Sequence, residues 1–193
     1  MISVVNTAQL KIDLNDFSAT IDTQIKKIAK ILENSGANTT YIPLDSVEVE
    51  KIWQARRASF AATTRLAPDV ISDDIIVSKK NLSYIITECE KIADKYNLKM
   101  TLVGHLGDGN IHPQYALNIE NEEEFRNYQK AKAEFYSIVK SVNGCISAEH
   151  GIGVEKIAYL KEILDNNTLE YMKIIKKAFD PKNILNPGKI FRV

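Results

Sequence analysis

Apolar residues recur at the three- to four-residue spacing of an amphipathic helix in several stretches of the chain. Gly36 follows the first stretch and is expected to end its helix, because glycine adopts the left-handed backbone common at helix termini. Asp45, with Glu48 three residues later, predicts a capping box that opens a second helix. The other helices are predicted over residues 21–32, 82–96 and 125–142, with two more before Pro181 and Pro187.

Strand patterns lie between these helices. The pattern breaks around Pro68 for about a dozen residues, which predicts a long loop. Strands are predicted where apolar residues alternate with polar ones or form short β-branched runs, at residues 10–14, 74–78 and 99–103, with a weaker extended segment at 40–44.

One tight turn decides the fold class. Asp108-Gly109 favours a hairpin whose tip is residues 107–110, so His105 and His112 are expected on its two arms. Because a hairpin requires antiparallel pairing, the prediction is an α+β fold with helices on one face of a mixed or antiparallel sheet. No repeat or low-complexity linker divides the chain, so a single domain over residues 1–193 is expected.

Composition narrows the function classes. The 193 residues hold 25 Lys and Arg against 25 Asp and Glu, so no net charge favours nucleic acid or an anionic membrane. No stretch is long and apolar enough to cross a bilayer, and the first residues lack a leader pattern, so a cytoplasmic protein is expected. Cys89 and Cys145 are too few and too far apart for a disulfide framework and are interpreted as buried free thiols.

All three histidines fall in two short windows, residues 104–112 and 149–151. Two hairpin histidines and one carboxylate form a set that binds Zn, Mn, Fe or Co and leaves coordination positions open. The predicted ligands are His105, His112 and Glu149, and His150 is left to move a proton.

Each of these residues also has a simpler interpretation. The glycines could build turns only, with the histidines hydrogen-bonded at strand ends. Asp108 is a competing ligand, although its turn position favours a local hydrogen bond. Arg56 beside Trp53 suits binding of a carboxylate, although an arginine considered alone more often belongs to a solvated helical face.

Three segments carry a family resemblance: residues 104–112 (GHLGDGNIH), 147–156 (SAEHGIGVEK) and 180–191 (DPKNILNPGKIF). They resemble the C-terminal, substrate-binding cap domain of FAD-linked oxidases such as glycolate oxidase, D-lactate dehydrogenase and D-2-hydroxyglutarate dehydrogenase. Residues 53–56 and 74–77 occupy the places of two further motifs of that family. The resemblance implies a ferredoxin-like α+β cap, with the FAD-binding half absent from this chain.

The resemblance also implies roles. His105, His112 and Glu149 would hold a divalent metal that takes the oxygens of a 2-hydroxy acid, and Arg56 would pair with the substrate carboxylate. His150 would act as the base in oxidation to a 2-oxo acid, with hydride transfer to FAD. Gln114 lies where some members place a polar substrate contact, and the tail from Asn186 to Lys189 resembles the segment that returns toward the flavin.

The sequence departs from the family pattern at Ser78, usually proline, and at Ala148, often glycine. The first hypothesis is the substrate and metal half of a flavin-dependent 2-hydroxy-acid dehydrogenase or oxidase, inactive unless joined to a flavin-binding domain or subunit. The alternatives are a self-contained metal-dependent hydrolase and a non-catalytic module that binds metal and hydroxy acid. Association with a further copy of the chain, a homo-oligomer, is left open, as are the substrate and the metal.

Overall fold

The computed structural model describes residues 9–14 and 18–191 and divides the chain into two compact units, residues 1–53 and 54–193. The expected single domain over residues 1–193 stays a prediction.

The first unit contains one whole helix and about the first two turns of a second. Helix α1 (Ser18–Asn34) ends in the expected glycine turn, because Gly36 has a φ of 85° and the Ala37 amide donates to the Leu32 carbonyl at 3.0 Å. Helix α2 (Ser46–Arg57) continues past this unit and begins at Asp45, whose Oδ1 accepts from the amides of Val47 and Glu48, both at 2.9 Å. The Glu48 carboxylate accepts the amide of Leu44, the residue before the cap, so the predicted helix start at Asp45 is confirmed with the returning hydrogen bond shifted by one residue.

The second unit is built on an antiparallel sheet of four strands, β1 (Asp69–Ser72), β2 (Ile75–Ile76), β3 (Lys99–His105) and β4 (Asn110–Leu117). Strand β4 lies in the middle, with β3 along one edge and both β1 and β2 along the other. The predicted hairpin is therefore confirmed as β3 and β4, and the α+β fold with an antiparallel sheet is confirmed with it.

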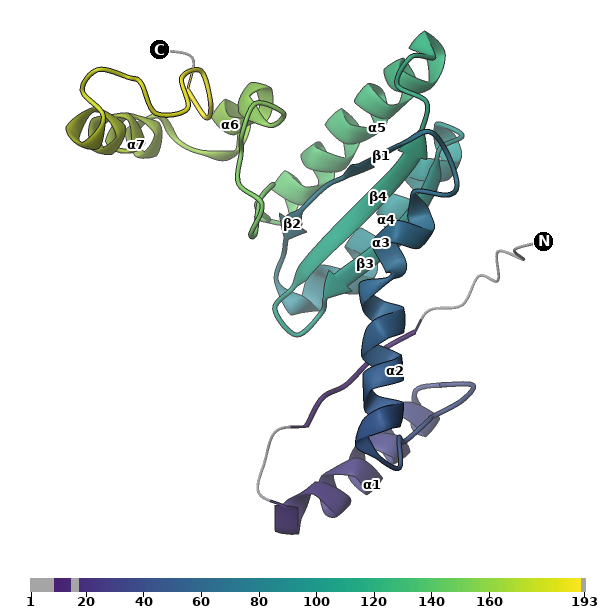
Figure 1. Cartoon of the computed structure of the whole chain (residues 1–193). Helices are drawn as coiled ribbons and strands as arrows, with labels where there is room; N and C mark the ends of the chain where they lie inside the picture. The colour runs from purple at the N-terminus through teal and green to yellow at the C-terminus, as the bar shows by residue number, and fades with distance from the viewer. Residues whose placement is uncertain (1–8, 15–17, 192–193) are drawn as a thin grey trace. The chain divides into compact units, whose positions relative to one another are not determined.

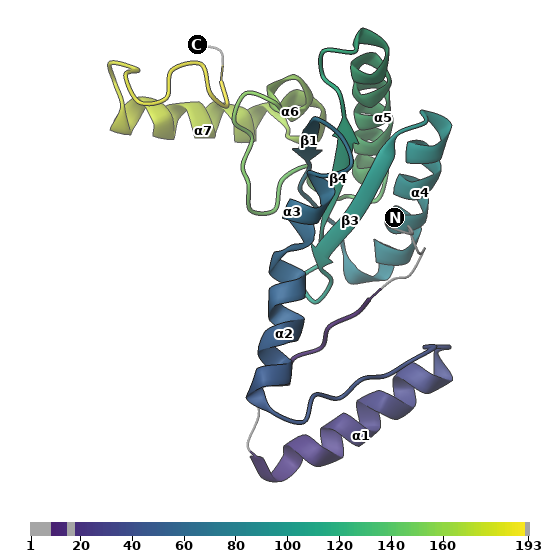
Figure 2. The same cartoon turned by 45° about the vertical axis from the view of Figure 1, so that its right-hand side comes forward.

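Helices α4 (Leu82–Lys95) and α5 (Glu122–Ser141) lie side by side on one face of this sheet (Figures 1 and 2). The main core lies between these two helices and the sheet, and every second residue of β4 points into it. Alternation along a strand sends Ile111 and Tyr115 into that core and His112 and Gln114 to the opposite face. The fully buried residues of the core include Ile75, Ile85, Cys89, Ile111, Ala131, Phe135, Val139 and Ile146. The predicted placement of helices on one face is confirmed for this pair.

A smaller cluster joins the last helices to the tail. Leu160 of α6 (Ile157–Ile163) and Leu169 of α7 (Asn166–Phe179) pack with Phe191. The Ile190 amide donates to the Gly153 carbonyl at 2.8 Å. The tail is therefore fastened to the loop that follows the second histidine window.

Two predicted strands, both within the described residues, are absent, and a third is shorter than predicted. Residues 10–14 form no strand, and Leu10 and Ile12 are 57% and 44% exposed, so their alternation reflects no buried face. Residues 40–44 are also irregular, and the strand expected at 74–78 is only Ile75–Ile76. The loop expected around Pro68 instead contains the short helix α3 (Ser59–Thr63) and strand β1, whose partner residues lie in β4.

Helix η1 (Lys79–Asn81), a 3-10 turn, leads into α4.

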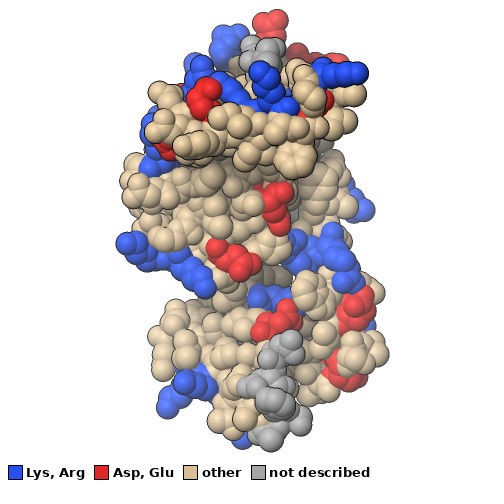
Figure 3. Space-filling model, turned by 90° about the vertical axis from the view of Figure 1, so that its left-hand side faces the viewer, with Lys and Arg blue, Asp and Glu red and all other residues tan. Residues whose placement is uncertain are grey.

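No helix within the described part of the chain is long and apolar enough to span a membrane. Basic and acidic side chains are interspersed on the face drawn in Figure 3, in keeping with their equal numbers. Both cysteines are free, Cys89 buried as predicted and Cys145 only partly buried.

Candidate metal and substrate site

The hairpin brings His105 and His112 together. His105 pairs with Asn110 in the ladder and His112 with Val103, and the two imidazole centroids lie 5.5 Å apart. The turn depends on Gly109, which has a φ of 81° and whose carbonyl accepts the Val77 amide at 3.0 Å. The expectation that His105 and His112 lie on the two arms of the hairpin is confirmed.

The second histidine window is anchored by Asp74, which stands directly before β2. Its Oδ2 accepts from the Ser147 hydroxyl at 3.0 Å and from three consecutive backbone amides, at 2.8 Å for Ala148 and 2.9 Å each for Glu149 and His150. A turn of this kind directs several N–H groups at one anion. The loop is thereby held against the sheet with Glu149 and His150 beside β4.

These hydrogen bonds also set the charge state of Asp74. Burial alone would raise its pKa, but the hydrogen bonds from His150, Glu149, Ala148 and Ser147 outweigh burial and hold the pKa of Asp74 below its ordinary value. The group is therefore a carboxylate at neutral pH.

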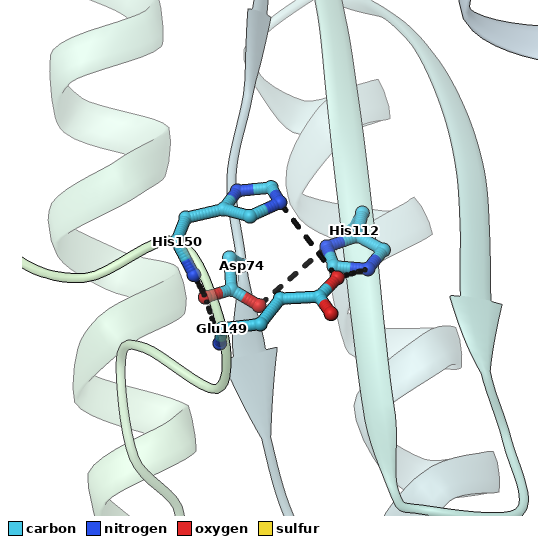
Figure 4. Close-up of side chains that lie close together, drawn as sticks. All are labelled: Asp74, His112, Glu149 and His150. Atoms are coloured by element: carbon cyan, nitrogen blue, oxygen red, sulfur yellow. Dashed lines mark hydrogen bonds and ion pairs between the residues drawn. The ribbon is translucent and has the colours of Figure 1, made fainter.

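Three imidazoles surround one oxygen of Glu149. The Nε2 atoms of His112, His105 and His150 lie 3.0, 3.6 and 3.8 Å from Glu149 Oε1. Glu149 and His150 reach from their loop toward His112 on β4 (Figure 4), and the rings of His112 and His150 are stacked with centroids 5.0 Å apart. The four side chains thus converge from the hairpin and from a loop distant in sequence.

His112 is the innermost member. Its side chain is 6% exposed, whereas those of His105, Glu149 and His150 are 48, 50 and 47% exposed. Burial lowers the pKa of His112, opposed by the charge of Asp74, so a neutral imidazole is favoured. The cluster consequently has a buried base and an open outer side.

Asp74 also faces the far side of the His112 ring. Oδ1 of Asp74 lies 3.5 Å from Nδ1 of His112, and neither atom has a hydrogen-bond partner among the described residues. A carboxylate behind a metal-binding histidine favours the proton on the rear nitrogen and frees the front nitrogen to bind a cation. In this arrangement Nε2 of His112 is the free nitrogen.

The donor set fits a divalent metal. Ligand atoms about 2.1 Å from a tetrahedral ion lie about 3.4 Å from one another, close to the separations around Glu149 Oε1. Asp74, His112, Glu149 and His150 each offer a ligand atom within 4.8 Å of the others. His105 stands outside that tighter group and contacts it through Glu149.

Gln114 lies two residues beyond His112 on the same face of β4. Its Oε1 accepts from the hydroxyls of Thr63 and Thr101, at 3.1 and 3.2 Å. The Ser59 carbonyl also lies 3.1 Å from the Thr63 hydroxyl and shares the single hydrogen of that hydroxyl with Gln114. Arg56 Nη1 donates to the Ser59 hydroxyl at 3.3 Å. The structure links Arg56 to Gln114 through α3, but no direct contact between Arg56 and the histidine cluster is observed in the described residues.

Asn186 and Lys189 are exposed and form a turn in which the Lys189 amide donates to the Asn186 carbonyl at 3.2 Å. The Ile190 amide then binds the Gly153 carbonyl, three residues beyond His150. The tail turn is thus attached to the loop that carries the site.

Sequence reasoning missed Asp74 as a member of the site. Two signals pointed to it: the acidic pair Asp73-Asp74 at the start of an apolar run, and the family motif that residues 74–77 resemble. Beside the cluster lies a hollow of about 350 Å³ lined by Ile76, His105, Asp108, Asn110, Ala148 and Glu149. Asp108 lines this hollow from the turn, and the structure gives its side chain no place in the tighter group.

Residues 7–190 match the family described as FAD linked oxidases, C-terminal domain. The chain belongs to this family. It is similar to glycolate oxidase subunit GlcD of Bacillus subtilis, with 34% identity over 172 residues, which is 89% of this chain and 37% of that protein. It is also similar to D-lactate dehydrogenase of Archaeoglobus fulgidus, with 31% identity over 169 residues, 88% of this chain and 37% of that protein.

GlcD of Escherichia coli strain K12 is 29% identical over 182 residues, covering 94% of this chain and 36% of the relative. The chain therefore spans little more than a third of the length of these relatives. By name these relatives are subunits of glycolate oxidase and a D-lactate dehydrogenase, and the family that the chain matches is the C-terminal domain of FAD linked oxidases.

Proposed function

We propose that this chain is the metal- and substrate-binding half of a flavin-dependent 2-hydroxy-acid dehydrogenase or oxidase of the glycolate or D-lactate type. The observation that carries the proposal is the convergence of three imidazole Nε2 atoms on one carboxylate oxygen at 3.0–3.8 Å. The family match adds that the relatives with this domain are named for glycolate and D-lactate.

In this proposal His105, His112 and Glu149 hold a divalent metal, which would supply a Lewis acid for the hydroxyl and carboxylate oxygens of the substrate. The half-exposed faces of His105 and Glu149 leave room for a substrate on the outer side of the cluster. His112 is the fixed ligand, because Asp74 orients its ring from behind.

His150 is assigned the proton transfer. Its ring is stacked on His112 and half exposed, so it can meet a substrate that approaches from the open side. It accepts the hydroxyl proton as the C–O double bond of the 2-oxo acid forms. FAD, bound by the flavin half, would supply the acceptor for the hydride that leaves the α-carbon.

Arg56 and Gln114 are proposed to bind the substrate, Arg56 through its carboxylate. The exposed turn from Asn186 to Lys189 is proposed to face the flavin, because its next residue is hydrogen-bonded to the loop that carries His150. The partner is then a flavin-binding domain or subunit, and the proposed location is the cytoplasm.

Titration of the zinc-loaded chain with D-lactate and with glycolate, followed by calorimetry, tests the substrate half of this proposal. Binding that requires zinc and weakens at least tenfold in Arg56→Ala is expected, since a bidentate pair with a carboxylate is lost. The matched control is Arg126→Ala, which changes an arginine on α5 and should bind both acids as the wild type does.

Two results would contradict the proposal. One is equal binding of D-lactate or glycolate with and without zinc. The other is oxidation of either acid by the flavin-free chain, because the hydride would then be transferred to an acceptor other than the proposed FAD. Zinc-dependent hydrolysis of esters that is lost in His105→Ala would instead favour the metal hydrolase.

A further inference from the structure

A buried lysine lies beneath the histidine cluster. Lys156, the residue before α6, is 4% exposed, and its ammonium has three acceptors. These are the Ile146 carbonyl at 2.7 Å, the Asp74 carbonyl at 3.0 Å and Asp73 Oδ1 at 3.1 Å. An ammonium group has three N–H donors, so this one is fully satisfied.

Two of these acceptors belong to the backbone that carries the site. Ile146 directly precedes Ser147, where the loop with Glu149 and His150 begins, and Lys156 ends the same loop. The other backbone acceptor belongs to Asp74, which holds the loop through its carboxylate. The Lys156 ammonium, at one end of the loop, therefore binds Ile146 at the other end and also Asp74, whose carboxylate accepts the amides in the middle of the loop.

The neighbouring carboxylates of Asp73 and Asp74 point in different directions. Asp73 turns into the core, where its Oδ1 also accepts the Tyr136 hydroxyl at 2.6 Å, while Asp74 faces His112. Lys156 pairs with Asp73, with Lys132 4.0 Å from the other oxygen of that carboxylate. The negative charges left facing the cluster are those of Asp74 and Glu149, which together match one divalent cation.

We propose that Lys156 is a positioning residue of the metal site: it fixes Ile146 and Asp74 so that Glu149 is held at ligand distance from His112 and His150 stays stacked beside that ring. This inference rests on the proposed function, since it requires that the cluster binds a divalent metal. Lys156 itself touches neither metal nor substrate.

A matched lysine separates this role from general stabilisation. Lys132 is 6% exposed, faces Asp73 and lies over the rings of Tyr128 and Tyr136, but among the described residues it makes no hydrogen bond to the loop. Lys156→Met and Lys132→Met thus each remove a buried positive charge near Asp73. They differ in whether the loop loses its anchor.

The experiment is titration of the full chain with Co²⁺, measuring affinity by competition with a chelator and the ligand geometry by visible absorption. Lys156→Met is expected to bind Co²⁺ about 10–100-fold more weakly with a changed absorption spectrum, the usual loss when an outer partner of a metal site is removed. Lys132→Met should stay within about threefold of the wild type with the same spectrum.

Near-ultraviolet circular dichroism checks that each variant is folded. If Lys156→Met does not fold, Asp73→Asn/Lys132→Met/Lys156→Met removes the carboxylate together with both lysines that face it, so no unpaired buried ion is left. The same loss of affinity, relative to Lys132→Met, is expected from that triple variant.

Wild-type affinity and spectrum in the folded Lys156 variants would overturn the inference, as would equal losses in Lys156→Met and Lys132→Met. Those results would leave the proposed metal site intact. A wild-type chain that binds no Co²⁺ would instead overturn the proposed function, and this inference with it.

Discussion

Replacing Asp74 by asparagine should destabilise the protein in a pH-dependent way. Oδ2 of Asp74 accepts four hydrogen bonds from the loop of residues 147–150. A hydrogen bond to a charged group contributes about 1.5–3 kcal/mol and a neutral one about 0.5–1.5 kcal/mol, so each bond loses about 1 kcal/mol. Because water can reach part of the loop, the expected loss in Asp74→Asn is about 2–4 kcal/mol.

The pKa of Asp74 is lowered in the folded state, which fixes the sign of the pH dependence. Its stabilising contribution is fully present above the ordinary aspartate pKa of about 3.9 and is lost as the pH falls through the lower folded-state pKa. The difference between wild type and Asp74→Asn should therefore be constant from about pH 5 to 8 and shrink below about pH 4.

Urea unfolding followed by circular dichroism at several pH values measures this difference. Asp94→Asn, which changes an exposed aspartate on α4, is the control and should stay within about 0.5 kcal/mol of the wild type. Equal stability of Asp74→Asn and wild type at pH 7, or a difference that persists unchanged in acid, would refute the assigned hydrogen bonding.

Three further predictions concern the hairpin and its surroundings. Gly109→Ala should lower stability by about 2 kcal/mol or more in a thermal melt, because φ is 81° and a Cβ would meet the Val77 carbonyl oxygen at 2.1 Å. Burial raises the pKa of Cys89 to about 12, so in native protein at pH 8 Ellman's reagent should leave it unmodified until urea is added. Gln114→Leu should cost about 1–3 kcal/mol in urea unfolding, because two threonine hydroxyls lose their shared acceptor; unchanged stability would contradict that network.

The sequence predicted the features that depend on neighbouring residues. The Asp108-Gly109 turn placed both hairpin histidines correctly, and Gly36 and the Asp45 capping box marked helix ends, because each is formed within a few residues. Strand β1 was missed because its side chains are only partly covered and its pairing partner is the distant β4. The alternation at residues 10–14 gave a wrong prediction, because no strand in the described residues pairs with this segment and its apolar side chains stay exposed.

The candidate site was predicted in part. Spacing and resemblance singled out the three histidines and Glu149, and the structure brings all four together. The role of Asp74 could not be predicted, because it depends on hydrogen bonds to a loop more than seventy residues later. The metal-ligand roles themselves, and those of Arg56, Gln114, Asn186 and Lys189, remain predictions.

The most direct test of the central claim is the metal content of the purified, untagged chain, measured with His105→Ala and His112→Ala in parallel. The account predicts about one divalent ion per chain in the wild type and its loss in both variants, with folding retained. A folded wild-type chain that takes up no metal when Zn²⁺, Mn²⁺, Fe²⁺ and Co²⁺ are each supplied would contradict it, as would metal retained in both variants.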